Sequence, residues 1–232
     1  MNPIVSLALA TAVFVGTHIL LSHPLRAGLV ARLGERGFAG VYSLVALATF
    51  AWMIIAWRRG SDANALWVAP LWWWPIASLL MLVASILLVG ALIRNPAFPK
   101  PGAAPRPIPD PRGVFAITRH PMNTSFMLWA LVHASISGSP RNLIVAGGIM
   151  ILALFGSIGQ DRKKERLLGE TWRDWEARTS FVPFGALLAG KVRWRDLMSG
   201  AAAPLIGGTI LWALATSYHA PLVSPLGDLL SR

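Results

Sequence analysis

The fold of this chain is decided by long apolar segments, of which the first is PIVSLALATAVFVGTHILL at residues 3–21. An α-helix rises 1.5 Å per residue, so a segment of about 20 apolar residues can cross the hydrocarbon core of a bilayer. No cationic residue precedes the segment, whereas a cleavable signal peptide starts with a positively charged region. We therefore expect residues 3–21 to remain in the protein as a membrane helix.

Five more apolar segments predict further membrane helices, at about residues 38–57, 72–93, 122–136, 143–159 and 204–218. The segments at 122–136 and 204–218 are the shortest. The composition agrees with membrane insertion: 55% of the residues are hydrophobic, 13% are charged and the mean hydropathy is +0.56. Soluble domains contain about 25% charged residues. We predict an all-α, polytopic membrane helix bundle of about six transmembrane helices.

The distribution of positive charge predicts the orientation of the bundle. The chain has 21 Lys and Arg residues and a formal net charge of +11, and 17 of these residues lie in the connections after the first, third and fifth segments. The positive-inside rule places such connections in the cytoplasm and the N-terminus outside. The main partner is then the lipid bilayer, and no nucleic acid is needed to explain the charge. The absence of cysteine excludes disulfides and thiolate metal sites.

Two of the cytoplasmic connections have distinctive compositions. Residues 95–111 contain seven prolines, and they predict an extended strap because proline and the residue before it disfavour helix. Residues 160–178 are dense in charge, and Leu167, Leu168, Trp172 and Trp175 have a helical spacing. We expect a cytoplasmic amphipathic helix there, lying along the inner membrane interface.

Histidines are the candidate metal ligands. The six segments contain no Asp, Glu, Lys or Arg, but His18 lies in the first segment and His133 in the fourth. An imidazole in hydrocarbon costs several kcal/mol unless each nitrogen has a partner, which can be a serine, a water, a backbone carbonyl or a metal. Because thiolates and intramembrane carboxylates are absent, a pair of neutral imidazoles best suits the axial positions of a haem iron. We predict that His18 and His133 bind one b-type haem, with interhelical hydrogen bonding as the alternative.

Four further side chains near the inner ends of the segments are candidates to bind the haem propionates. They are Arg26, Arg119, His23 and His120. Cationic side chains bind carboxylates through charge-assisted hydrogen bonds. The alternative for each arginine is a positively charged flank of a membrane helix.

Three motifs resemble the NnrU family of bacterial membrane proteins. They are THILLSHPLR at residues 17–26, GERGFAGVYSL at residues 34–44, and residues 118–133, which begin with TRHPM and end with LWALVH. The resemblance covers about residues 3–190. It implies an NnrU-like transmembrane domain at residues 1–190 in the bacterial inner membrane. A basic linker and a C-terminal membrane helix are then expected at residues 191–232.

The resemblance also implies a cofactor and a choice of functions. Members of the family are linked to denitrification and nitric oxide reduction. The family is similar to the plant 15-cis-zeta-carotene isomerases, which are haem b membrane proteins whose axial histidines match His18 and His133. A bis-His haem protein is therefore implied, either an isomerase of a lipophilic polyene or a factor that serves a denitrification protein. A switchable cysteine of the plant enzyme has no counterpart in this chain.

A second resemblance suggests a different class of enzyme. Residues 119–121, Arg-His-Pro, are similar to the start of the C-terminal signature of the isoprenylcysteine and phospholipid methyltransferases, and Glu165 matches a downstream glutamate. In those enzymes the signature binds S-adenosylmethionine at the cytoplasmic face. Trp172 and Trp175 stand here in place of tyrosines. A membrane methyltransferase is thus the alternative enzyme, and a non-enzymatic assembly or regulatory partner of a respiratory complex is the third hypothesis.

Overall fold

A computed structural model of the protein describes residues 2–60, 64–98 and 108–223. Over these residues the secondary structure is helical, apart from one isolated bridge between Val68 and Ser137. The long helices are α1 (Pro3–Ser22), α2 (Arg26–Arg58), α3 (Trp73–Leu92), α5 (Pro121–Ile136), α6 (Pro140–Leu168) and α10 (Ala202–Val223). The short helices are α4 (Val114–Ile117), α7 (Glu170–Arg178), α8 (Gly185–Leu188) and α9 (Trp194–Leu197).

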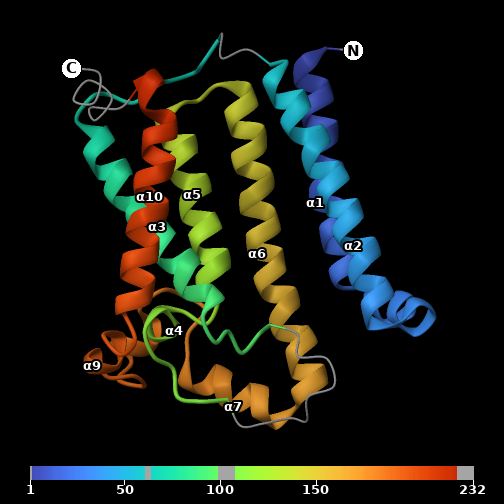
Figure 1. Ribbon diagram of the computed structural model, residues 1–232, viewed down its shortest axis with the longest axis vertical. Helices are drawn as coiled ribbons and strands as arrows, with labels where there is room; N and C mark the ends of the chain where they lie inside the picture. Colours follow the sequence, from blue (N-terminus) through green and yellow to red (C-terminus); the bar gives the residue numbers. More distant parts are fainter. Residues whose placement is uncertain (1, 61–63, 99–107, 224–232) are drawn as a thin grey trace.

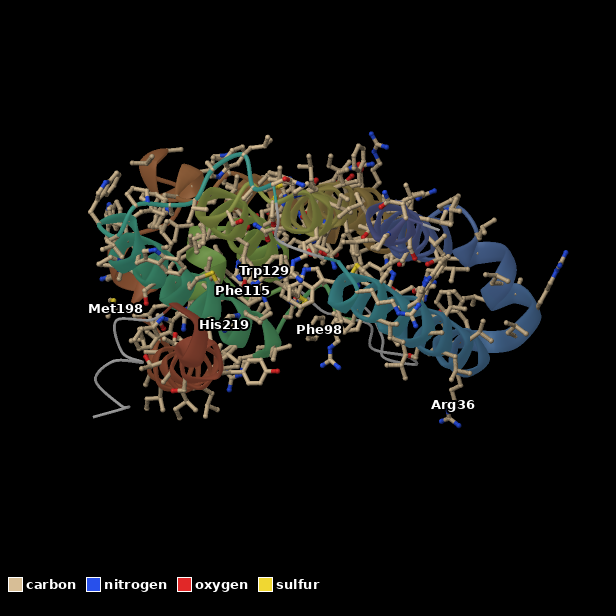
Figure 2. The ribbon with its side chains drawn as sticks, turned by 90° about the horizontal axis from the view of Figure 1, so that it is seen from above. Arg36, Phe98, Phe115, Trp129, Met198 and His219 are labelled. Atoms are coloured by element: carbon tan, nitrogen blue, oxygen red, sulfur yellow. The ribbon has the colours of Figure 1, made fainter. Side chains whose placement is uncertain are left out.

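The long helices pack side by side along a common direction (Figure 1). The start of α1 and the end of α10 lie at one end of the bundle, whereas α4, α7 and α9 lie at the other end (Figure 1). Neighbouring helices follow the order α2, α1, α6, α5, α3, α10, so that α6 contacts both α1 and α5, and α3 contacts both α5 and α10. Seen from above, the helices form a curved row (Figure 2).

Within the described ranges, four helices are long and apolar enough to cross a membrane: α1, α2, α3 and α6. The protein is therefore a polytopic helical membrane protein. Two of the six predicted spans, at residues 122–136 and 204–218, correspond to α5 and α10, which are not among the four. α5 is the shorter of the two, with 16 residues. A six-span topology and an outward N-terminus stay predictions.

The predicted segment 38–57 lies within α2, but this helix is longer and bent. Gly34 interrupts it with φ 69° and ψ 169°, a backbone conformation that is essentially restricted to glycine. The part before Gly34 carries Arg32, and the part just after it carries Arg36; both side chains are exposed. The bend therefore lies within the charged first part of α2, and the apolar segment begins after Arg36.

The predicted amphipathic helix at residues 160–178 is not confirmed as one element. α6 continues from its apolar part to Leu168, and Gly169, with φ 53°, separates it from α7. Trp172 and Trp175 are 0% and 2% exposed and pack with Phe115 in a hydrophobic cluster. The two tryptophans and Leu168 thus face the interior of the protein, whereas Leu167 is exposed. The predicted strap at 95–111 is not helical where it is described, and residues 99–107 lie outside the described residues.

α1 and α6 approach each other closely at Gly148. A Cβ atom added to Gly148 would lie 2.3 Å from the Cγ2 atom of Thr11 on α1, so only glycine fits this contact. Leu7 and Phe14 of α1 are buried next to it in a cluster that also contains Met53 of α2. This seam fixes the α1–α2 pair against the rest of the bundle.

Candidate functional site

The first predicted ligand, His18, is oriented by α1 and α2. Its Nδ1 atom lies 2.8 Å from the carbonyl oxygen of Phe14, four residues earlier on α1. A carbonyl oxygen can only accept a hydrogen bond, so Nδ1 carries a proton and donates it. The ring centroid of His18 lies 4.2 Å from that of Phe14 and 5.6 Å from that of Tyr42 on α2. These two aromatic neighbours hold the imidazole between the first two helices.

The second predicted ligand, His133, is held in the same way on α5. Its Nδ1 donates to the Trp129 carbonyl oxygen at 2.9 Å, and its ring stacks on the Trp129 indole with centroids 4.0 Å apart. A third histidine, His219 on α10, donates from Nδ1 to the Ala215 carbonyl oxygen at 2.7 Å. The ring centroids of His133 and His219 are 6.4 Å apart. Trp129 and His219 are labelled in Figure 2, which shows them near each other in the view along the bundle.

The hydrogen bond to the carbonyl group four residues earlier, here called the i−4 brace, determines what these three rings can bind. A neutral imidazole with its proton on Nδ1 has a lone pair on Nε2. Histidines that bind metals commonly donate from their other nitrogen to a carbonyl or carboxylate in this way. In the part of the chain that the structure describes, Nε2 of His18, His133 and His219 has no hydrogen-bond partner. Each Nε2 is chemically suited to bind iron.

The structure does not bring the rings of His18 and His133 into contact. The ring contacts of His18 are with Phe14 and Tyr42, whereas those of His133 are with Trp129 and His219. α6 contacts both parent helices and lies between them (Figure 1). Ligation of one haem by this pair stays a prediction. Among the described residues there is also no group of three or more His, Asp or Glu side chains that could hold a metal ion.

Arg119 and His120, two of the predicted propionate ligands, bind Asp161 at the charged end of α6. Arg119 donates to the Asp161 carboxylate from Nε at 2.9 Å and from Nη2 at 2.8 Å. The Nε2 atom of His120 lies 3.0 Å from the same carboxylate, and its Nδ1 atom lies 3.1 Å from the Gln160 side-chain oxygen. A second carboxylate, Glu176 of α7, lies 3.8 Å from Arg119. This polar network joins α6 and α7 to the turn that begins α5.

The network also shifts the pKa values of its two carboxyl groups, in opposite directions. Burial of Asp161 disfavours its charged form, but the hydrogen bonds from His120 and Arg119 outweigh burial and lower the pKa of Asp161. The pKa of Glu176 is raised by burial and by the nearby charge of Asp161, against the opposing effect of Arg119. Asp161 is therefore the main carboxylate partner of Arg119 and His120.

The other two predicted propionate ligands, Arg26 and His23, lie on the opposite side of the α6 end. Arg26 forms an ion pair with Glu35 at 2.7 Å and lies over the ring of Phe38, 5.2 Å from its centroid. His23 packs on Gly159 of α6, where an added Cβ would lie 2.4 Å from the imidazole ring. The four predicted residues thus form two separate clusters, and their binding to haem propionates stays a prediction.

The residues that resemble a methyltransferase signature form structural contacts. Glu165 binds Arg173 at 2.9 Å on the exposed surface, and Trp172 and Trp175 are in the core. The cavity beside Arg119 and His120 has a volume of about 40 Å³, which is near the volume of one water molecule, about 30 Å³. Nothing in this arrangement gives separate support to an S-adenosylmethionine site.

Comparison with known proteins decides the family. A family model described as NnrU protein matches residues 6–225. The chain belongs to the NnrU family. This NnrU family member is also 32% identical over 79 residues to the chloroplastic 15-cis-zeta-carotene isomerases of Arabidopsis thaliana and Zea mays.

That alignment covers 34% of the chain and 22% of each isomerase, so the chain spans about a fifth of the length of the curated relatives it matches. No solved structure matches the NnrU family member.

The sequence analysis of this NnrU family member does not identify two residues that the structure places beside predicted site residues. They are Asp161, beside Arg119, and His219, beside His133. Asp161 was assigned only to a charged surface helix, although it follows the apolar segment 143–159 almost directly. A carboxylate so close to a membrane segment could have indicated a partner for Arg119. His219 was not predicted to be near His133, because nothing in the sequence shows that α10 returns to α3 beside α5.

Proposed function

We propose that this NnrU family member is a membrane-embedded haem protein that isomerises a lipophilic polyene. Family membership and the 32% identity to two enzymes named for the isomerisation of 15-cis-zeta-carotene support this function. The apolar helices also support it, because they give the protein access to a substrate dissolved in the bilayer. The proposal extends the relatives' named activity to a chain that matches about a fifth of their length.

The i−4 brace of His18 and His133 is the observation that carries the cofactor proposal. Each brace fixes the Nδ1-protonated tautomer and leaves the Nε2 lone pair without a partner. In hydrocarbon a nitrogen lone pair without a partner is unfavourable, and a bond to iron removes that cost. Each imidazole, one on α1 and one on α5, offers the kind of nitrogen donor that an axial haem ligand requires, which supports the proposal.

The chain's own groups have distinct roles in this proposal. The bound haem would supply a redox-active iron centre close to the substrate double bonds. Phe14, Tyr42 and Trp129 orient the two imidazoles through the ring contacts described above. The outer surfaces of α1 and α6 are apolar, so they attract hydrocarbon and not water. A polyene can lie in the hydrocarbon next to them.

The cofactor proposal is tested by absorption spectra of protein purified after haem-replete expression. We expect a Soret band of a low-spin, bis-His haem, and we expect its loss in a His18→Ala, His133→Ala double variant. His219→Ala is the matched control, because His219 has the same i−4 brace and lies beside His133. If His219→Ala removes the low-spin spectrum and His18→Ala leaves it intact, the proposed ligand pair is wrong. The absence of any Soret band refutes haem binding itself.

The isomerase proposal is tested separately, with the reduced protein in lipid vesicles that contain 15-cis-zeta-carotene. Chromatography should detect the isomer with a trans double bond at the 15-position. The rate of its formation should depend on His133. A haem-loaded protein that leaves the isomer ratio unchanged contradicts the proposed reaction and leaves the haem proposal standing.

A further inference from the structure

A cavity of about 410 Å³ lies where the connection between α1 and α2 meets the end of α6. Its volume is within the range of about 300–1,000 Å³ that is typical of small-molecule sites. Ile19, Phe155 and Ile158 contribute apolar walls, whereas His23, Arg162 and Arg166 contribute polar groups. Of the six predicted haem-site residues, only His23 lines this cavity, so the cavity is distinct from the two predicted axial ligands, His18 and His133.

Apolar and cationic groups are separated along the cavity. Ile158, Arg162 and Arg166 follow one another at intervals of four residues on α6, so they lie on one face of the helix. The apolar side chain is nearer the membrane-spanning part of α6, and the two guanidinium groups are one and two turns beyond it. Such a gradient matches a ligand with an apolar chain and an anionic head.

The two arginines of the cavity have no carboxylate partner among the described residues. Arg166 donates from Nε to the backbone oxygen of Arg162 at 3.2 Å, a contact that leaves its charge uncompensated. The nearby acidic side chains are paired elsewhere: Glu165 binds Arg173, and Glu35 binds Arg26. The cavity is thus lined by two guanidinium groups whose positive charge remains available to an anion.

The imidazole of His23, which lines the cavity, responds to the nearby positive charge. The pKa of His23 is lowered by burial, and Lys163 and Arg166 lower it further. The Nδ1 atom of His23 is buried and has no hydrogen-bond partner. An anion in the cavity would offset the repulsion among these cations and provide an acceptor or hydroxyl group for His23.

We propose that this cavity binds the phosphate group of an anionic phospholipid, with an acyl chain along Ile19, Phe155 and Ile158. Basic pockets between membrane helices near the membrane surface are known sites for anionic headgroups. The phosphate would lie between Arg162 and Arg166, which can donate several hydrogen bonds in a fixed geometry. This inference is independent of the proposed haem and isomerase functions.

Native mass spectrometry of the detergent-solubilised full chain tests the proposal. The probes are dioleoyl-phosphatidylglycerol and dioleoyl-phosphatidylcholine, titrated separately. We expect preferential binding of phosphatidylglycerol and an affinity about 30-fold lower in an Arg162→Gln, Arg166→Gln variant, from the usual contribution of two surface cations. The matched control is Arg32→Gln, Arg36→Gln, which removes the same charge from equally exposed residues that do not line the cavity and should change the affinity less than about 3-fold.

Four outcomes contradict the proposal. Equal affinities for the two lipids contradict recognition of an anionic headgroup. Equal losses of phosphatidylglycerol affinity in the two glutamine double variants show that only the overall positive charge matters. Competition by inorganic phosphate at concentrations that displace the lipid completely shows that the site takes a free anion. If the glutamine variant does not fold, an Arg162→Lys, Arg166→Lys variant replaces it. This variant keeps both positive charges and should retain most of the lipid affinity. Loss of lipid binding by this folded lysine variant contradicts recognition by positive charge.

Discussion

Asp161→Asn is expected to destabilise the protein at the end of α6 and should reveal how much the polar network contributes. The Asp161 side chain is 13% exposed, and its two partners, Arg119 and His120, are 15% and 1% exposed. Removing one partner of a buried ion pair usually costs about 3–5 kcal/mol, because the other charge is left uncompensated. Glu176 lies 3.8 Å from Arg119 and remains as a partial replacement. We therefore expect a loss of about 2 kcal/mol.

Thermal unfolding in detergent, followed by circular dichroism, measures this loss. For a chain of this size a loss of about 2 kcal/mol corresponds to a Tm decrease of about 4–8 °C. The matched control is Asp174→Asn, which breaks the exposed ion pair between Asp174 and Arg178 and should lower Tm by no more than about 2 °C. If Asp161→Asn lowers the Tm at pH 7 by no more than this control does, the network does not stabilise the fold.

The pH dependence provides a second test of the same residue. The pKa of Asp161 in the folded protein is below its ordinary value of 3.8, so its ionisation stabilises the fold above that value. This contribution is lost as the pH falls through the folded pKa. The stability difference between the wild type and Asp161→Asn should therefore be constant near neutral pH and shrink below about pH 4. A difference that grows on acidification contradicts the assignment.

Three further substitutions test the packing and the backbone of the fold. Gly148→Ala should lower the stability by about 1–3 kcal/mol, because its Cβ would overlap α1, whereas Gly147→Ala, with no atom near its added Cβ, should be neutral in the same thermal assay. Gly34→Ala should cost about 1–3 kcal/mol, because alanine is strained at φ 69° and ψ 169°; an unchanged Tm contradicts the bend. Trp175→Ala should cost about 3–5 kcal/mol, because its 2% exposed indole fills the core, and limited proteolysis should then cleave α7 more rapidly.

The length of the apolar segments made part of the fold predictable from the sequence. The segments predicted at 3–21 and 72–93 closely match α1 at Pro3–Ser22 and α3 at Trp73–Leu92. Each is a continuous apolar run in which every residue favours the same environment. The end of α6 was not predictable in this way, because the dense charge after Gly159 resembles an independent surface helix. Its actual end at Gly169 depends on the positive φ of that glycine, which the sequence alone does not reveal.

The candidate site was predictable one residue at a time but not as an arrangement. The cost of polar groups in hydrocarbon was sufficient to select His18 and His133, and the structure gives each of them a specific partner on Nδ1. Which rings are neighbours depends on how separate helices pack. The proximity of His133 to His219 follows from the contacts of α5 and α10 with α3. A single sequence contains no comparable signal for such long-range contacts.

The i−4 brace of His18 and His133 has a consequence for how these residues enter the membrane during biosynthesis. Donor and acceptor belong to the same helix, so the hydrogen bond forms together with the first turns of the helix, before any other segment arrives. Each nascent segment can then be inserted with one ring nitrogen already hydrogen-bonded. The translocation machinery therefore handles a moderately polar residue, and assembly of the finished bundle is not a precondition for insertion.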